Sequence, residues 1–95
     1  MKHCIIMTFI LQEDGQEAFI KEAERLKSFW EEQGYLYSLY RDVSQKNQFI
    51  QHFLTDHSID DFTELIQENE VARAAIGELK GRADKVIITV LNQLV

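Results

Sequence analysis

The sequence is poor in cysteine and in basic residues. It has a single cysteine, Cys4, and therefore has no partner for an internal disulfide and no second thiol for a cysteine-based zinc site. Ten Lys and Arg stand against sixteen Asp and Glu, and the resulting net charge of -6 repels nucleic acid and anionic membrane surfaces. We therefore expect neither of these partners, and we expect Cys4 to act as a small apolar strand residue.

The sequence also lacks a long apolar run. The early stretch CIIMTFIL is too short to span a bilayer, and the QEDGQE that follows has no small-residue pattern for signal-peptide cleavage. These features predict a cytoplasmic protein without a membrane segment. With 95 residues, of which 45% are apolar, the chain is expected to form one ordered domain over residues 1–95.

Apolar periodicity predicts four strands. Residues 3–11 and 85–94 are apolar at both alternating sets of positions, which is typical of strands covered on both faces. Residues 35–41 and 48–55 have strand composition and are joined through DVSQKN, which predicts a hairpin.

Two helical regions separate these strands. Residues 16–33 carry apolar side chains at a 4-3-4 spacing on one helix side, followed by Gly34 as a C-terminal cap: Phe19, Ala23, Leu26 and Trp30. The second region begins with a capping box of Ser58 and Asp61. It continues as a helix over residues 70–80, which aligns three apolar residues and ends at Gly81: Val71, Ala75 and Leu79.

The order β-α-β-β-α-β predicts an α+β ferredoxin-like sandwich, in which a four-stranded antiparallel sheet carries its helices on one face. The helices leave the second face uncovered, although the first and last strands are apolar on both sides. A second copy of the chain is the simplest cover, because a two-fold axis lets one patch serve both partners. We therefore expect a homodimer whose sheets pack face to face.

Three segments resemble a known family in their order and spacing. LQEDGQEAF resembles the end of the family's first strand, with a glycine before a helix; EEQGYLYSLYRD resembles its entry into the second strand; and FIQHFLTDHSIDDFTELIQ resembles its third strand and following helix. The family is the antibiotic biosynthesis monooxygenase-like (ABM-like) domains of the dimeric α/β-barrel superfamily. The resemblance covers nearly the whole chain and implies a pocket between helices and sheet for a small apolar or aromatic ligand.

The sequence departs from this family at positions that matter for chemistry. Leu54 stands where the family often has tryptophan, His52 replaces an acidic residue, and Leu65 or Ile66 occupies the usual place of a helix histidine. That histidine is the usual ligand in the haem-degrading members, so haem binding there is disfavoured and no cofactor is expected. Cofactor-independent oxygenation stays compatible with the sequence, since it depends chiefly on an enclosed pocket for a polarised aromatic substrate.

His52 is the candidate catalytic residue. It shares strand parity with apolar neighbours, and its imidazole could exchange a proton with a phenol-like substrate, or equally lie in the core or a dimer interface. His57 precedes Ser58 and is expected to pack on Phe62 at the helix entry. The three histidines follow no recognised ligand spacing, so no metal site is expected.

Four further residues are candidates for substrate binding. Thr8 falls near a polar position of the family's first strand, and Tyr37 and Tyr40 lie on opposite faces of a strand. Trp30 could form a stacking wall for a planar ligand. Core or interface packing is the alternative role for Trp30 and the tyrosines.

Two functions of different classes follow. The first is a small-molecule-binding protein that acts as a cofactor-independent monooxygenase on an aromatic or quinol-like substrate. The second is a non-catalytic homodimeric module for ligand binding or regulation, which the missing family histidine and tryptophan favour. Whether the chain is an enzyme stays open at this point.

Overall fold

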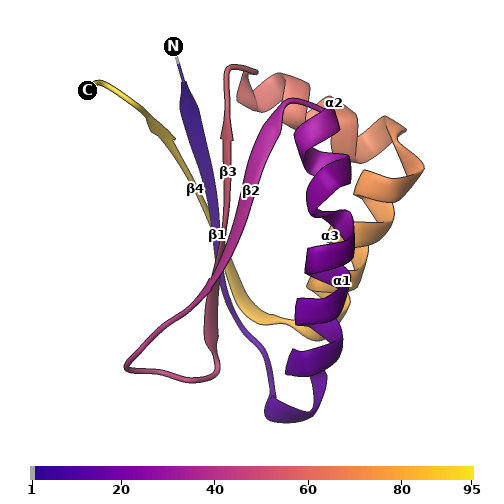
Figure 1. The fold of residues 1–95 in the computed structure, drawn as a ribbon, viewed down its shortest axis with the longest axis vertical. Coiled ribbons are helices and arrows are strands. Elements are labelled where there is room, and N and C mark those ends of the chain that lie inside the picture. Colours follow the sequence, from indigo (N-terminus) through magenta and orange to yellow (C-terminus); the bar gives the residue numbers. More distant parts are fainter. Residues whose placement is uncertain (1) are drawn as a thin grey trace.

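A computed structural model describes residues 2–95 and has the predicted element order, with the second helical region divided in two (Figure 1). The strands are β1 (His3–Ile10), β2 (Tyr35–Arg41), β3 (Gln48–Thr55) and β4 (Asp84–Asn92). The helices are α1 (Glu13–Glu32), α2 (Ile59–Glu68) and α3 (Glu70–Arg82). None of the helices in residues 2–95 combines the length and the apolar character that a membrane crossing requires.

The sheet has the order β2-β3-β1-β4, and each neighbouring pair is antiparallel. All three helices lie on one side of it (Figure 1). In β1, β2 and β3 the odd-numbered residues face the helices and the even-numbered residues face the other way, as the alternating burial along β1 and β3 shows. The predicted ferredoxin-like α+β fold is therefore confirmed.

The core between sheet and helices is built around aromatic rings. Phe53, at the centre of β3, is fully buried, and its ring centroid lies 4.9 Å from that of Trp30, 5.0 Å from that of Phe62 and 5.1 Å from that of Tyr37. Edge-on and tilted ring pairs at these distances add to the stabilisation from burial alone. This cluster ties α1, α2 and the hairpin together.

The opposite side of the sheet, called the open face below, has no helix over it. Its side chains come from the even-numbered residues of β1, β2 and β3 and the odd-numbered residues of β4, and most are apolar: Cys4, Ile6, Ile10, Leu36, Tyr40, Ile50, Leu54, Ile87 and Leu91. Ile87 is 60% exposed and Tyr40 is 55% exposed. On β4 the exposure extends to the helix side as well, where Ile88 is 52% exposed. The uncovered apolar surface that the sequence predicts is therefore present.

Two details of the helices differ from the prediction. Helix α3 runs through Gly81 and ends at Arg82, so Gly81 does not stop it. Its buried stripe is Ala72, Ile76 and Leu79, one position away from the predicted stripe at its start, and Val71 is 41% exposed. The cause is Asn69, which ends α2 and caps α3 by accepting hydrogen bonds from the backbone N–H of Val71 and Ala72, and so sets the rotation of α3 at that bend.

Gly34 occupies a position that only glycine fills without strain. Its φ of +94° lies in the left-handed region, and an added Cβ would stand 2.7 Å from Nε2 of His57. We expect Gly34→Ala to lower the free energy of unfolding by more than about 1 kcal/mol in a urea titration. Gly77→Ala is the matched control, because an added Cβ there meets nothing within 4 Å in the helix interior and should raise stability. Equal effects at both sites would contradict this account.

Candidate functional site

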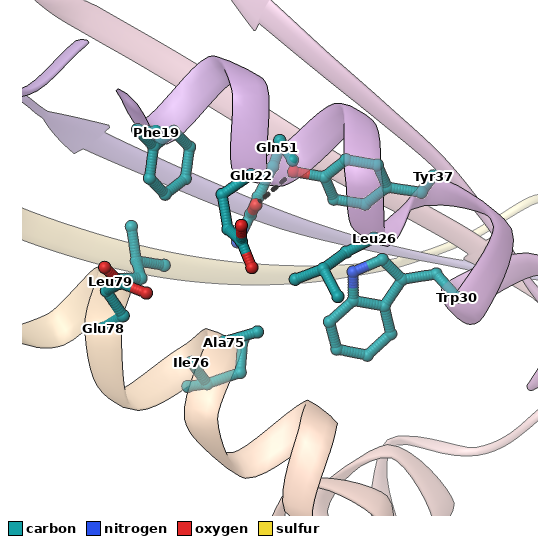
Figure 2. Close-up of a pocket in the computed structure, with 11 residues that line it drawn as sticks. Phe19, Glu22, Leu26, Trp30, Tyr37, Gln51, Ala75, Ile76, Glu78 and Leu79 are labelled. Atoms are coloured by element: carbon teal, nitrogen blue, oxygen red, sulfur yellow. Dashed lines mark hydrogen bonds between the residues drawn. The ribbon is translucent and has the colours of Figure 1, made fainter. Parts of the chain in front are cut away.

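A narrow pocket lies where α1 and α3 pass over the sheet (Figure 2). Its walls are mostly apolar side chains of the two helices: Phe19, Ala23, Leu26, Ala75, Ile76 and Leu79. The enclosed space measures about 30 Å³, which is room for one or two water molecules. In this conformation the pocket is a narrow, partly open slot.

A wider groove lies directly above the slot, between the same helices. It has a volume of about 230 Å³ and shares Glu22, Leu26, Ala75 and Glu78 with the slot below. The side of the groove formed by α3 includes Ala74 and Ala75, which are short side chains. A separation of the two helices would therefore join groove and slot into one cleft that reaches the sheet.

The floor of the slot carries a buried polar pair. The Tyr37 hydroxyl donates to Oε1 of Gln51 at 2.7 Å (Figure 2). Nε2 of Gln51 lies 3.2 Å from the Met7 sulfur. Both Tyr37 and Gln51 are at most 5% exposed. A thioether is a weak acceptor, and the amide has two N–H donors, so Gln51 keeps donor capacity for a ligand, while the Tyr37 oxygen keeps an acceptor site.

The Trp30 indole adds a second donor at this floor. Trp30 is 2% exposed, and no hydrogen bond of its nitrogen is found within residues 2–95. In the same residues, every fully buried side-chain nitrogen or oxygen has a hydrogen-bond partner. The indole nitrogen must therefore have access to open space, and Figure 2 shows it turned toward the interior of the pocket.

Two carboxylates stand at the rim of the slot. Glu22 accepts hydrogen bonds from Arg25, and Glu78 lies 2.8 Å from Arg82. The hydrogen bond from Arg25 lowers the pKa of Glu22, so this carboxyl is ionised near neutral pH and cannot supply a proton to a ligand. The rim thus consists of two ion pairs, and neutral hydrogen-bonding groups lie only at the floor.

Because Tyr35 and Tyr37 are buried, we expect the free energy of unfolding to fall at alkaline pH. Burial, followed by the charge of Asp61, raises the pKa of Tyr35 to about 12, and burial also raises the pKa of Tyr37. Unfolding returns both groups to a pKa of about 10. The stability that each raised pKa contributes is complete below pH ~10 and is lost as the pH rises toward the folded-state value.

We therefore expect the free energy of unfolding, measured by urea titration, to fall above pH ~10. The fall should be smaller in Tyr35→Phe and Tyr37→Phe, and Tyr40→Phe should keep it, since the Tyr40 ring is largely exposed. An alkaline loss that is the same in Tyr37→Phe as in the parent protein would contradict the prediction.

The structure divides the five predicted site residues between two faces of the sheet. Trp30 and Tyr37 line the slot. Thr8, Tyr40 and His52 are even-numbered strand residues and belong to the open face. His52 lies on the open face because its neighbours Gln51 and Phe53 face the helices, and successive side chains of a strand point to opposite sides.

The histidines also lie apart from one another. Nε2 of His52 is 3.2 Å from the Cys4 sulfur on the open face, and His3 pairs with Oδ1 of Asn92 at 2.7 Å. The His57 ring packs against Tyr35, with centroids 5.3 Å apart, and the Tyr35 ring in turn lies 5.3 Å from that of Phe62. The predicted capping box of Ser58 and Asp61 is confirmed.

Gln51 is the pocket residue that the sequence reading missed. It lies between Phe49 and Phe53 in the set of β3 residues that face the helices, and it is the polar member of that set at the pocket. A glutamine in register with two buried aromatic residues needs a hydrogen-bond partner, and this signal was available in the sequence.

Comparison with known proteins identifies the fold. No family model matches the chain, and no curated protein matches it in sequence. Solved structures do match over nearly the whole length. A variant of SnoaB from Streptomyces nogalater, described as a cofactor-independent oxygenase, aligns with a TM-score of 0.78 and 14% identity, covering 99% of this chain and 94% of that one.

Two further structures agree. A protein from Nitrosomonas europaea, provisionally named an antibiotic biosynthesis monooxygenase, has a TM-score of 0.79 and 14% identity over 98% of this chain and 90% of its own. This chain has the ABM-like fold. Rv0793 from Mycobacterium tuberculosis aligns with a TM-score of 0.79 and 16% identity, and the alignment covers 100% of this chain and 97% of Rv0793. The resemblance predicted from the sequence is thus confirmed for the fold.

Proposed function

We propose that this ABM-like chain binds a small, planar aromatic molecule that carries hydroxyl or carbonyl groups, in the pocket between α1 and α3. The observation that supports the proposal most strongly is the floor of the pocket, where Trp30, Tyr37 and Gln51 offer hydrogen-bonding capacity inside apolar walls. Ligand sites are typically apolar cavities with a few placed polar groups. A quinol or quinone has matching oxygens at its edge.

The shape of the site favours a flat ligand. The lining rings of Phe19, Trp30 and Tyr37 present broad apolar faces, and a flat molecule needs the smallest separation of α1 and α3. Because the slot measures only about 30 Å³, ligand entry has to move the two helices apart and displaces few water molecules. Closure over the ligand would shield it from solvent.

We further propose that the functional unit is a homodimer formed through the open face, in the cytoplasm, where the Cys4 thiol stays reduced. The uncovered apolar side chains of all four strands support this assembly. His52 and Cys4, which lie 3.2 Å apart, would satisfy each other at that interface. His52 then serves the interface, and ligand binding depends on Trp30, Tyr37 and Gln51.

Isothermal titration calorimetry with duroquinone tests the binding proposal, because this planar quinone has no free ring position for addition by Cys4. We expect Gln51→Leu, which removes an N–H donor for a quinone carbonyl, to weaken binding by roughly fivefold, the value of about one net hydrogen bond. Tyr37→Phe removes the hydroxyl that holds the Gln51 amide and should weaken binding by a smaller factor. Gln67→Leu on the exposed face of α2 is the matched control and should bind as the parent protein does. Unchanged affinity in both pocket variants would refute the assigned site.

The second candidate function is oxygenation of such a ligand without a cofactor, and the observation that favours it is the fold shared with the SnoaB variant. When an activated CH2 group between aromatic rings becomes a carbonyl, the substrate supplies four electrons to O2. One oxygen atom stays on the carbon and the other leaves as water. The donors at the pocket floor would hold the ring oxygens and stabilise negative charge on them.

An oxygen electrode with anthrone as substrate distinguishes the two functions. An oxygenase consumes one O2 per anthrone, and the rate should fall at least about tenfold in Gln51→Leu if the amide N–H stabilises the charged transition state. Oxygen uptake no faster than in the absence of protein, together with tight duroquinone binding, would leave the protein as a binding module.

A further inference from the structure

A second concave surface lies on the helix side, away from the slot. It is a groove of about 500 Å³ at the end of the molecule where α1 ends, β2 begins and α2 runs past both (Figure 1). It is lined by Gln33, Tyr35, His57, Asp61, Glu64, Leu65, Glu68 and Asn69. Since these residues lie on the helix side of the sheet, the proposed dimer leaves the groove open.

The groove is strongly acidic. Asp61, Glu64 and Glu68 lie along one side of α2 at the spacing i, i+3, i+7, and no Lys or Arg is among the lining residues. Neither Glu64 nor Glu68 forms an ion pair within residues 2–95. Arg73, which donates to the Gln67 carbonyl at the end of α2, stays outside the lining.

The end of α1 adds to this negative potential. The 20-residue helix ends at Glu32, next to its C-cap Gln33 at the groove; its last turn has no basic residue, and its final residues are Glu31 and Glu32. The aligned peptide dipoles give a helix C-terminus partial negative charge, which favours a cation there. By contrast, Lys80 and Arg82 occupy the last turn of α3.

Tyr35 provides an independent sign of a ligand at the groove. Tyr35 is only 2% exposed, yet no hydrogen bond of its hydroxyl is found within the described chain. Because no fully buried side-chain oxygen in residues 2–95 lacks a partner, this hydroxyl must reach open space, and the groove is the cavity that Tyr35 lines. Asp61 lines the same groove as Tyr35, and its charge contributes, after burial, to the raised pKa of Tyr35.

The arrangement suits an organic cation better than a metal ion. In residues 2–95 no three His, Cys, Asp or Glu side chains converge as metal ligands would. Glu64 and Glu68 are instead spaced one helical turn apart, and the same groove is lined by Tyr35 and Leu65. We propose that this groove binds a small alkyldiammonium cation, with its charged ends on Glu64 and Glu68 and with the Tyr35 hydroxyl as an additional hydrogen-bond acceptor.

The test uses two-dimensional ¹H–¹⁵N NMR of the full chain at about pH 8, where a histidine side chain is mostly neutral. 1,4-Diaminobutane is titrated as the probe, with 1,4-butanediol as its uncharged analogue and MgCl2 as the metal. We expect saturable shifts for the diamine at the groove residues, no comparable shifts for the diol, and weaker binding of Mg²⁺.

Variants distinguish binding at the groove from attraction of the diamine by the overall negative charge of the chain. Glu64→Gln/Glu68→Gln should weaken diamine binding by roughly fivefold, and Tyr35→Phe by a similar factor of about five. Glu13→Gln/Glu24→Gln removes the same charge from exposed positions of α1 outside the groove and should change affinity by less than about twofold. Because Glu64 and Glu68 are exposed, the first pair tests the site even if Tyr35→Phe folds poorly.

An equal loss of affinity in the two double variants would overturn the proposal, as would binding of the diol or of Mg²⁺ at least as tight as that of the diamine. Each of these results concerns only the groove, since the variants leave the slot between α1 and α3 intact.

Discussion

Ile6→Asp is expected to raise the dissociation constant of the proposed dimer by about a thousandfold or more, because it buries an unpaired charge at the interface. Ile6 lies near the centre of the open face, on the central strand β1, between His52 of β3 and Thr89 of β4. In a single chain this position is only partly covered, so the aspartate can stay hydrated and the fold is retained. In a dimer with packed sheets the same carboxylate would lose its water.

Sedimentation velocity over a range of micromolar concentrations measures this effect, with circular dichroism as the check that the variant is folded. Ser28→Asp adds the same charge on the exposed side of α1 and should leave the dimer intact. Ile87→Asp gives a second variant. Because Ile87 is 60% exposed on the open face, this substitution should lower the stability of the monomer only slightly. A parent chain that sediments as a monomer, or an Ile6→Asp chain that remains dimeric, would rule out this interface.

Phe53→Ala is expected to lower the free energy of unfolding by about 3–5 kcal/mol. The ring has no exposure and contacts the rings of Trp30, Tyr37 and Phe62, which belong to α1, β2 and α2. Its removal leaves a cavity between three elements that cannot all close on it at once. The loss is a large part of the ~5–15 kcal/mol that stabilises a typical domain.

Urea unfolding at one fixed chain concentration gives this free energy, since a dimer's stability depends on concentration. Phe29→Ala is the matched control: the Phe29 ring is half-buried on α1, and its removal should cost less than about 2 kcal/mol. A loss for Phe53→Ala that does not exceed the loss for Phe29→Ala would contradict the central place of Phe53 in the core.

The sequence predicted the fold well because its strand and helix patterns are regular. Residues 35–41 and 48–55 form strands with the predicted bounds, and Ser58 with Asp61 caps α2 as expected. The rotation of α3 could not be predicted, because it depends on Asn69, which ends one helix and begins the next. The spacing of apolar residues within α3 does not indicate where that bend lies.

The candidate site could be predicted only in part from the sequence. Strand alternation separates Tyr37 from Tyr40 and groups His52 with Ile50 and Leu54, but only the packed helices show that Tyr37 and Trp30 line the slot while Thr8 and His52 lie on the open face. Strand alternation could also have identified Gln51 as a pocket residue, because Gln51 lies between Phe49 and Phe53 in the set of β3 residues that face the helices. The narrow width of the slot depends on how α1 and α3 pack, which no local pattern encodes.

The fluorescence of Trp30 tests the central claim most directly, because Trp30 is the one tryptophan of the chain and lines the proposed ligand pocket. We predict that duroquinone quenches this emission to saturation with one site per chain. Ala75→Phe fills the slot from α3 and should abolish the saturable quenching, while Ala74→Phe in the groove above should reduce it less. Quenching that is linear in duroquinone, or the same in Ala75→Phe as in the parent chain, would contradict binding between α1 and α3.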